Sequence, residues 1–382
     1  MTTAELVFSE GRLILARTGT DDPTLRAWDA ADELLLEQAL DVAAGIEEPR
    51  VLVVDDQFGA LALGLSRLSP IVVADSAVLP AALASNAALN SAFSSAKQVY
   101  SWIDPPAGPF DLVVLRIPRQ ADYLAWLLRW LNGVITDSSV LLAGGMIKHL
   151  PSKSVEVFGE AVQTEQVLPA RKKARVIRCR KGTESLAGWP GCWKGYALSG
   201  RNGELAVQAL PAVFAREKLD IGSRLLLPHV AREVSSSQAG SSVMDLACGN
   251  GVLGLTALSE RRDVQLGFSD VSSHAVLSAR RNVEQAFPEA SAFFSHCDGI
   301  DIGAGAFELI LLNPPFHEGG VVGDHIALRL FEQASKHLKP GGHLLMVGNR
   351  HLGYHRSLRR YFSRVEQLDA SPKFVVFRAS NR

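Results

Sequence analysis

The second half of the chain repeats the order of strand and helix patterns found in the first half. When Gly59 is aligned with Gly251, the apolar residues that follow the two glycines match. Further on, the aliphatic run at residues 110–118 aligns with the run at residues 307–315. Strands that alternate with helices are typical of doubly wound parallel sheets, and a repeat of whole units indicates a duplicated domain. We therefore predict an α/β protein with two tandem Rossmann-like domains.

The length of the chain agrees with two domains, because 382 residues exceed what one hydrophobic core usually serves. We predict a first domain at residues 1–185 and a second at residues 186–382, with a glycine- and tryptophan-rich linker and hairpin near their junction. A serine-rich surface loop is expected at residues 235–242. The elements predicted for the first half are helices at Arg26–Ala44 and Ala60–Leu68 and strands at Val51–Val54, Ile71–Val73, Leu112–Ile117, Val140–Leu142 and Arg175–Cys179.

Composition is typical of a soluble globular protein, with 47% hydrophobic and 21% charged residues. The first residues show neither the basic lead nor the long apolar core of a signal peptide. No apolar run reaches the roughly 18 residues of a membrane span. The four cysteines lie far apart without a C-x-x-C pair, which argues against a zinc site and a disulfide framework. We expect a cytoplasmic protein with no metal and no membrane partner.

An apolar run in the second half ends abruptly at a polar residue and two prolines. Residues 309–312 are four aliphatic residues, as in a strand buried on both faces, and proline cannot continue the sheet. Asn313 is therefore predicted at the carboxyl end of a strand, where open α/β sheets bind ligands. Its amide oxygen and the carbonyl of Pro314 can accept both hydrogens of an exocyclic amino group, while Phe316 stacks on the ring. Taken alone, the same pattern also fits a core strand that ends at proline.

A glycine-rich turn precedes this strand in the second half. Residues 249–254 match G-x-G-x-x-G after an apolar strand, so the backbone amides of the next helix are expected to face a ligand. Gly249 and Gly251 are predicted to bind a cofactor. Asp245 lies four residues before Gly249 and suits the ammonium group of an amino-acid tail, whereas it would repel a pyrophosphate. This distinction argues against a dehydrogenase.

Two further acids follow the next two strands. Asp270 is placed to accept the hydroxyls of a ribose, and Asp298 can accept from an adenine amino group. Each has a structural alternative, since Asp270 also fits a helix cap before Ser272 and Asp298 also fits a turn.

The first half has the pattern of the fold but different residues at the chemical positions. A glutamine in place of glycine would fill the space that a ligand needs, so the first domain is predicted to have no functional cofactor site. The paired positions are Asp245 with Val53, Gly249 with Gln57, and Asn313 with Arg116.

Positive charge is concentrated at residues 171–181, which hold seven lysines and arginines and no acid. A solvated surface is one interpretation of such a run. Its place beside a nucleobase-sized site favours a polyanion, and Arg171, Lys172 and Lys173 are predicted to contact it.

These motifs resemble the class I S-adenosylmethionine-dependent methyltransferases that modify exocyclic amines, although Ala247 stands where a third glycine is common. Within that class, nearly the whole chain resembles the ribosomal RNA large subunit methyltransferase G family, the 23S rRNA guanine-N2 methyltransferases. The stretches that carry the resemblance are residues 25–33, 58–61, 171–175, 219–222, 311–317, 348–352 and 373–376.

The resemblance implies S-adenosylmethionine as cofactor and 23S rRNA as substrate, protein-free or at an early stage of assembly, with the chain as a monomer. Guanine N2 needs no catalytic base before attack, so positioning by Asn313, Pro314 and Phe316 is expected to carry the reaction. Pro315 and His317 are assigned to substrate contact, and Asn313 also to the cofactor. Two alternatives stay open: a guanine-N2 methyltransferase of 16S rRNA, and a non-catalytic RNA-binding assembly protein.

Overall fold

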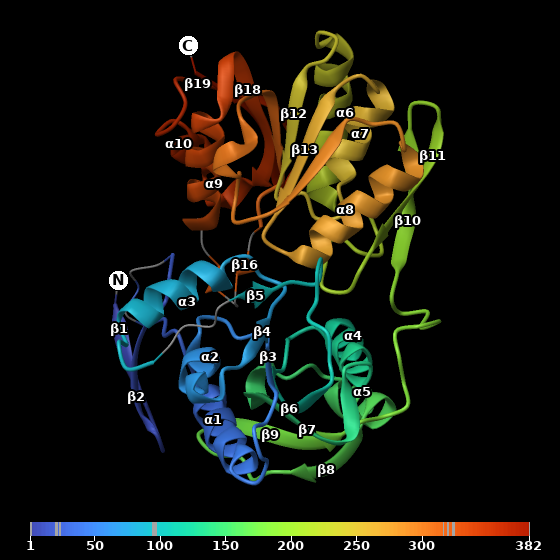
Figure 1. Ribbon diagram of the computed structural model, residues 1–382. Coiled ribbons are helices and arrows are strands. Elements are labelled where there is room, and N and C mark those ends of the chain that lie inside the picture. The colour runs from blue at the N-terminus through green and yellow to red at the C-terminus, as the bar shows by residue number, and fades with distance from the viewer. Residues whose placement is uncertain are drawn as a thin grey trace. The chain divides into compact units, whose positions relative to one another are not determined.

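A computed structural model of the protein describes residues 2–19, 22, 24–93, 98–315, 317–318, 321–322 and 325–381. The chain divides into two compact units, Met1–Cys192 and Trp193–Arg382. The junction between them lies a few residues beyond the predicted boundary at residue 185. Figure 1 shows the elements of both units.

The first unit is built on a seven-stranded sheet of order β5-β4-β3-β6-β7-β9-β8. The first five strands in this order pair in parallel, and β9 pairs antiparallel with β7 and β8. A separate hairpin of β1 and β2 precedes the sheet in the chain. The strands of this unit are β1 (Thr3–Phe8), β2 (Gly11–Ala16), β3 (Val51–Val54), β4 (Ile71–Val73), β5 (Val99–Tyr100), β6 (Phe110–Arg116), β7 (Ile135–Met146), β8 (Gln163–Val167) and β9 (Ala174–Arg180).

Helices cover both faces of this sheet (Figure 1). One hydrophobic core joins α1, α2 and α3 to alternate residues of the central strands, among them Val53 and Val114. The aromatic residues Trp102, Trp126 and Trp130 pack together edge to face in the same unit. The helical elements are α1 (Ala30–Ala43), α2 (Ala60–Gly64), η1 (Ser66–Leu68), α3 (Leu79–Ala88), α4 (Ala121–Asn132), η2 (Ile147–His149) and α5 (Ser154–Ala161).

The second unit has a seven-stranded sheet of order β14-β13-β12-β15-β18-β20-β19, which is the order of the first unit with equivalent strands in equivalent places. Its first five strands are parallel and β20 is antiparallel to both neighbours. The predicted duplication is therefore confirmed at the level of topology. The strands are β10 (Lys194–Gly200), β11 (Gly203–Ala209), β12 (Ser242–Leu246), β13 (Gln265–Asp270), β14 (Ala292–His296), β15 (Phe307–Leu312), β16 (His317–Glu318), β17 (Val321–Val322), β18 (Leu338–Asn349), β19 (Arg364–Ala370) and β20 (Phe374–Ser380).

Side chains of β15 alternate between the two faces of the second sheet. Leu309 and Leu311 pack in one core with α6, α7 and α8, whereas Ile310 and Leu312 pack in the other with α9 and α10. Figure 1 shows these helices beside the sheet of the second unit. Strand β15 is buried on both faces, as its sequence predicts. The helical elements are α6 (Ile221–Ser236), α7 (Val252–Glu260), α8 (Ser273–Ala286), η3 (Ile302–Ala304), α9 (His325–Lys336), η4 (Arg350–Leu352) and α10 (Tyr354–Leu358).

The structure corrects three predicted boundaries. The helix predicted from Arg26 begins at Ala30, because the Asp29 side chain caps its first turn. The helix predicted at Ala60–Leu68 ends at Gly64, and a short 3₁₀ turn follows. The serine-rich segment predicted as a loop from Ser235 starts inside α6, which ends at Ser236. Within the described part of the chain, no helix combines the length and the apolar character needed to span a membrane.

Candidate active site

Asn313 directly follows β15 at the carboxyl end of the second sheet, as the sequence predicts. Pro314 is buried and Pro315 is exposed. Because β12 and β13 run parallel to β15, the residues that follow all three strands meet at the same edge. Phe316 lies outside the described residues, and of His317 the structure describes only the backbone in β16.

The amide of Asn313 is held in one orientation. Its Nδ2 donates to Oδ2 of Asp220 at 3.0 Å and to Oγ of Ser223 at 3.0 Å. Both amide hydrogens are thereby used. The other end of the side chain, Oδ1, is buried and has no hydrogen-bond partner among the described residues. A buried acceptor without a partner costs about 1–3 kcal/mol, so an outside donor that reaches Oδ1 is favoured.

The glycine-rich turn joins β12 to α7. Gly249 and Gly251 have φ values of 55° and 80°, in the region that favours glycine. A Cβ on Gly251 would press against Ala279 of α8 at 3.0 Å, whereas a Cβ on Gly249 would meet nothing within 4 Å. Gly251 therefore serves close packing, and the open space beside Gly249 is available to a ligand.

Asp245 lies beneath this turn rather than on its surface. The side chain is fully buried, and its Oδ2 accepts from the backbone N–H of Gly254 at 2.8 Å. Burial, together with the nearby charge of Asp270, raises the pKa of the Asp245 carboxyl well above its usual range. Its Oδ1 has no partner among the described residues. Asp245 thus holds the turn on the helix, a structural role that the sequence prediction did not include, and keeps one acceptor unused.

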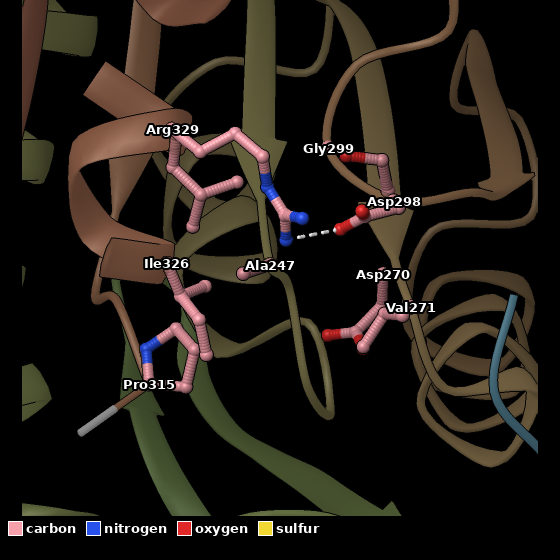
Figure 2. Close-up of a pocket in the computed structure, with 10 residues that line it drawn as sticks. Ala247, Asp270, Val271, Asp298, Gly299, Pro315, Ile326 and Arg329 are labelled. Atoms are coloured by element: carbon pink, nitrogen blue, oxygen red, sulfur yellow. Dashed lines mark hydrogen bonds and ion pairs between the residues drawn. The ribbon is translucent and has the colours of Figure 1, made fainter. Parts of the chain in front are cut away.

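Asp270 and Asp298 line a pocket at the strand ends (Figure 2). Asp270 accepts from the backbone N–H groups of Gly249 and Ser272, each at 2.9 Å, so it also fixes the glycine turn and the start of α8. The cofactor interpretation and the capping alternative for Asp270 are compatible, because a carboxylate has about four acceptor sites. The remaining lining residues are Ala247, Ser269, Val271, Gly299, Pro315, Ile326, Arg329 and Leu330.

Arg329 is a pocket residue that the sequence did not indicate. It extends from α9, and its Nη2 forms an ion pair with Oδ1 of Asp298 at 2.6 Å across the pocket (Figure 2). Its Nε is buried without a partner among the described residues. An arginine at an amphipathic helix face gives no local signal of such a contact, because the facing strand end is 31 residues away in the chain.

The residues of this edge fit an S-adenosylmethionine-type ligand. They offer the carboxylate of Asp270, that of Asp298 with its partner Arg329, and an open space beside Gly249. Buried side-chain oxygens without a partner among the described residues are found on Asp245, Ser269 and Asn313. Positive groups and hydroxyls of a ligand can satisfy such acceptors. Among the described residues, no group of three or more His, Cys, Asp or Glu side chains could hold a metal ion.

At the equivalent edge of the first unit, the residue that ends the strand is paired within the protein. Arg116, at the end of β6, is 8% exposed and donates two hydrogen bonds to Asp29, each at 3.0 Å, and its Nε lies 3.3 Å from Asp32. The arginine is therefore paired with two acids of its own unit. Gln57, which aligns with Gly249, is exposed. That its side chain fills the space of a ligand stays a prediction.

The basic segment is partly neutralised within its own unit. Arg171 pairs with Glu37 at 2.6 Å, and Lys172 pairs with Glu33 at 2.8 Å. Lys173 is exposed. Two of the three cations predicted to contact RNA thus already have carboxylate partners from α1, which charge counting along the sequence missed.

Sheets of this order, with a ligand pocket at the strand ends of the second copy, define a tandem protein of the class I methyltransferase fold. Comparisons with known proteins specify the family. Residues 3–183 match the model of the RLMG N-terminal domain, and residues 204–378 match that of the methyltransferase small domain. The chain is 39% identical to the ribosomal RNA large subunit methyltransferase G of Pseudomonas entomophila over 97% of this chain and 98% of the relative. It is 38% identical to that of Alcanivorax borkumensis over 93% of this chain and 91% of the relative.

The chain therefore belongs to the ribosomal RNA large subunit methyltransferase G family. Among solved structures, it resembles a T. thermophilus 16S rRNA N2 methyltransferase in complex with AdoMet and guanosine, with a TM-score of 0.74, 23% identity and coverage of 100% of this chain and 98% of the other. At that identity the similarity is one of fold.

Proposed function

We propose that this chain transfers a methyl group from S-adenosylmethionine to the exocyclic N2 of a guanine in 23S ribosomal RNA. Membership in the family makes it an S-adenosylmethionine-dependent methyltransferase of large-subunit ribosomal RNA. The choice of an amino nitrogen, and of guanine N2 among amino nitrogens, is the finer part of the proposal.

The observation that carries the proposal is the unpaired Oδ1 of Asn313. This oxygen is held at the end of β15 because Nδ2 of the same amide donates two hydrogen bonds, and it has no partner of its own among the described residues. An exocyclic amino group is the donor that such an acceptor suits, whereas a hydroxyl or a ring carbon would not need two acceptors side by side. In the proposal, the carbonyl of Pro314 accepts the second amino hydrogen.

Asp270 and Asp298 are proposed to hold the ribose and the adenine of the cofactor, with Gly249 and Gly251 shaping the turn beside them. Asp245 is proposed to face the amino-acid tail through its unused Oδ1. When bound, S-adenosylmethionine supplies an electrophilic methyl group on a sulfonium.

The chain's own residues would act mainly by position. Guanine N2 is a weak nucleophile because its lone pair is delocalised into the ring. By accepting the amino hydrogens, Asn313 and Pro314 would turn that lone pair out of conjugation, and their hydrogen bonds would strengthen as positive charge develops on nitrogen. Phe316, Pro315 and His317 are proposed to contact a base swung out of its stack. A histidine in this place orients the base through a hydrogen bond.

The proposal of guanine over adenine rests on the family resemblance and not on a base-specific contact. The fold is shared with an enzyme named as a 16S rRNA N2 methyltransferase, which is the origin of the small-subunit alternative. We favour 23S rRNA because the relatives that cover almost the full chain carry the large-subunit name.

The first domain is proposed to bind RNA without binding cofactor. Lys173 would contact the phosphates of the RNA backbone. Arg171 and Lys172 would join it when they leave Glu37 and Glu33 for phosphates. A second set of exposed cations, Arg356 and Arg359, lies on and just after α10, which begins near the same sheet edge as Asn313 because β18 runs parallel to β15. We further propose a cytoplasmic monomer that acts on protein-free or early-assembly RNA.

Nucleoside analysis tests the proposal. The 23S and 16S ribosomal RNAs from cells that lack the gene are incubated separately with the purified protein and S-adenosylmethionine, then digested and examined by mass spectrometry. N2-methylguanosine at a single position of 23S rRNA is the expected product. Methylation of adenine, or of 16S rRNA alone, would contradict the finer part of the proposal.

A further inference from the structure

We propose that Asp220 is a positioning residue, which fixes the Asn313 amide so that its oxygen faces the substrate. This inference rests on the proposed role of Asn313 as the acceptor of the substrate amino group. It adds the reason why that acceptor has one orientation rather than two.

Asp220 is itself held by a helix. It is the N-cap of α6, and its Oδ2 accepts from the backbone N–H of Ser223 at 2.8 Å. The same oxygen accepts from Nδ2 of Asn313 at 3.0 Å. One carboxylate oxygen thus links the first turn of α6, a helix of 16 residues, to the side chain that follows β15.

The chemistry of the two groups determines which end of the amide faces outward. A carboxylate only accepts hydrogen bonds, so the amide must turn its nitrogen toward Asp220. Ser223, which is 4% exposed, takes the other hydrogen through Oγ. With both hydrogens used, a flipped amide would place its oxygen against the carboxylate and its N–H groups against the substrate amino group. Such a flipped amide could not bind an amine.

The first domain supplies an independent observation. Asp29 is the N-cap of α1, and Asp32 follows it three residues later, the same spacing as Asp220 and Ser223 at the start of α6. Both acids contact Arg116, the residue at the end of the strand equivalent to β15. Helix start and strand end therefore make a polar contact in both copies. In the first copy, Arg116 is paired with both acids. In the second copy, Oδ1 of Asn313 has no partner among the described residues.

The charge of Asp220 adds to its geometry. A hydrogen bond to a carboxylate is stronger than one to a neutral group, and it polarises the amide so that Oδ1 becomes more negative. An acceptor polarised in this way gains most when positive charge develops on the amino nitrogen, which is a gain in turnover rather than in ground-state binding.

Four variants test the inference. Asp220→Ser keeps a good helix cap and is too short to reach Asn313, so the fold is expected to survive. Asn313→Ala removes the proposed acceptor, and the double variant combines the two. Glu217→Ser is the matched control, because it removes an exposed acid three residues earlier that pairs with Lys194 and not with Asn313.

We expect Asp220→Ser to lower kcat roughly 10-fold or more, the scale of a misplaced reacting group, with KM for RNA and cofactor affinity within a few-fold. Glu217→Ser should keep the wild-type kcat. In the Asn313→Ala background, Asp220→Ser should cause no further loss, because Asp220 acts through Asn313. If Asp220 acted only on the fold, Asp220→Ser would lower kcat by the same factor in the Asn313→Ala background as in the wild type.

A second measurement does not depend on activity. With asparagine labelled by ¹⁵N, the side-chain amide signals of Asn313 are identified by their absence in Asn313→Ala. We expect these hydrogens to exchange slowly with water in the wild type and faster in Asp220→Ser, and to be unaffected in Glu217→Ser.

The outcomes separate the two proposals. If Asn313→Ala keeps wild-type turnover, the proposed function fails. If Asn313→Ala is impaired while Asp220→Ser keeps both its turnover and slow amide exchange, the positioning inference alone is overturned. Additive losses in the double variant would also overturn it.

Discussion

The guanidinium of Arg116 donates two hydrogen bonds of 3.0 Å to the carboxylate of Asp29 at the sheet edge of the first domain. A planar guanidinium suits such a two-point contact, which fixes both groups. At the equivalent place in the second domain, the shorter side chain of Asn313 contacts Asp220, and its oxygen has no hydrogen-bond partner in the part of the chain that the structure describes. The two copies of one fold thus differ in whether the strand-end residue is satisfied by the protein itself.

Replacement of Arg116 by alanine should destabilise the first domain strongly. It would leave Asp32, which is 5% exposed, without its cation. Loss of one partner of a buried ion pair costs about 3–5 kcal/mol. Tryptophan fluorescence during urea unfolding reports on this domain, since five of the six tryptophans precede residue 193. A change in unfolding free energy of less than about 0.5 kcal/mol, the usual effect of a surface substitution, would contradict this role.

Cofactor binding should be confined to one site in the full-length chain. Calorimetry should give one S-adenosylmethionine per chain. Gly249→Gln, which introduces the residue of the first copy into the open space at φ 55°, should weaken binding roughly 10-fold or more and reveal no second site. Gly341→Gln is the control, because Gly341 also has positive φ and open space but lies near the start of β18, at the end of that strand opposite the site. Two sites per chain would contradict the prediction that the first domain binds no cofactor.

The order of elements could be predicted well because it depends on local patterns. Aliphatic runs that end at polar residues located β3, β4 and β15 within one or two residues. Helix ends were less accurate, since the cap at Asp29 depends on a side-chain contact, and the change to a 3₁₀ turn after Gly64 leaves no mark in the periodicity.

The site was only partly predictable, and the reason is distance along the chain. Asn313, Asp270 and Asp298 stand at strand ends that the pattern itself reveals. Asp220 reaches the site from 93 residues away and Arg329 reaches Asp298 from 31 residues away, so neither contact leaves a local signature. The pairing of Arg171 with Glu37 is hidden for the same reason.

The stability of the first domain should fall as pH rises from about 4 to about 7. Burial, with the charge of Asp75, raises the pKa of Asp55 to about 7, against about 3.9 for an unfolded chain. Below pH 4 both states hold the proton and the contribution of Asp55 is fully present. Between the two pKa values only the folded state holds it, so stability is lost until pH passes 7.

Asp55→Asn tests this dependence, because asparagine is neutral at every pH and tolerates the φ of 56° at this position. The variant should gain stability relative to the wild type from pH 5 to pH 8, measured by urea unfolding with tryptophan fluorescence. A constant difference between the two proteins over this range would show that Asp55 does not titrate there.

The basic segment at residues 171–181 should bind RNA more strongly when the acids of α1 no longer pair with it. Lys173→Ala should lower affinity for protein-free ribosomal RNA and reduce the salt slope by about 0.7 to 0.9, the contribution of one phosphate contact. Glu37→Gln should raise the affinity, because it frees Arg171 from an ion pair of 2.6 Å. Unchanged RNA binding in both variants would contradict this interface and favour the exposed Arg356, Arg359 and Arg360 in its place.

The role of Asn313 is tested most directly by Asn313→Ala, with turnover on large-subunit RNA and S-adenosylmethionine affinity measured on the same preparation. Loss of one preorganised acceptor at the reacting centre should cut kcat by roughly 10² or more, with cofactor affinity within a few-fold of wild type. Turnover close to wild type, or a large loss of cofactor affinity with turnover preserved at saturation, would contradict the role of its unpaired oxygen in holding the substrate amine.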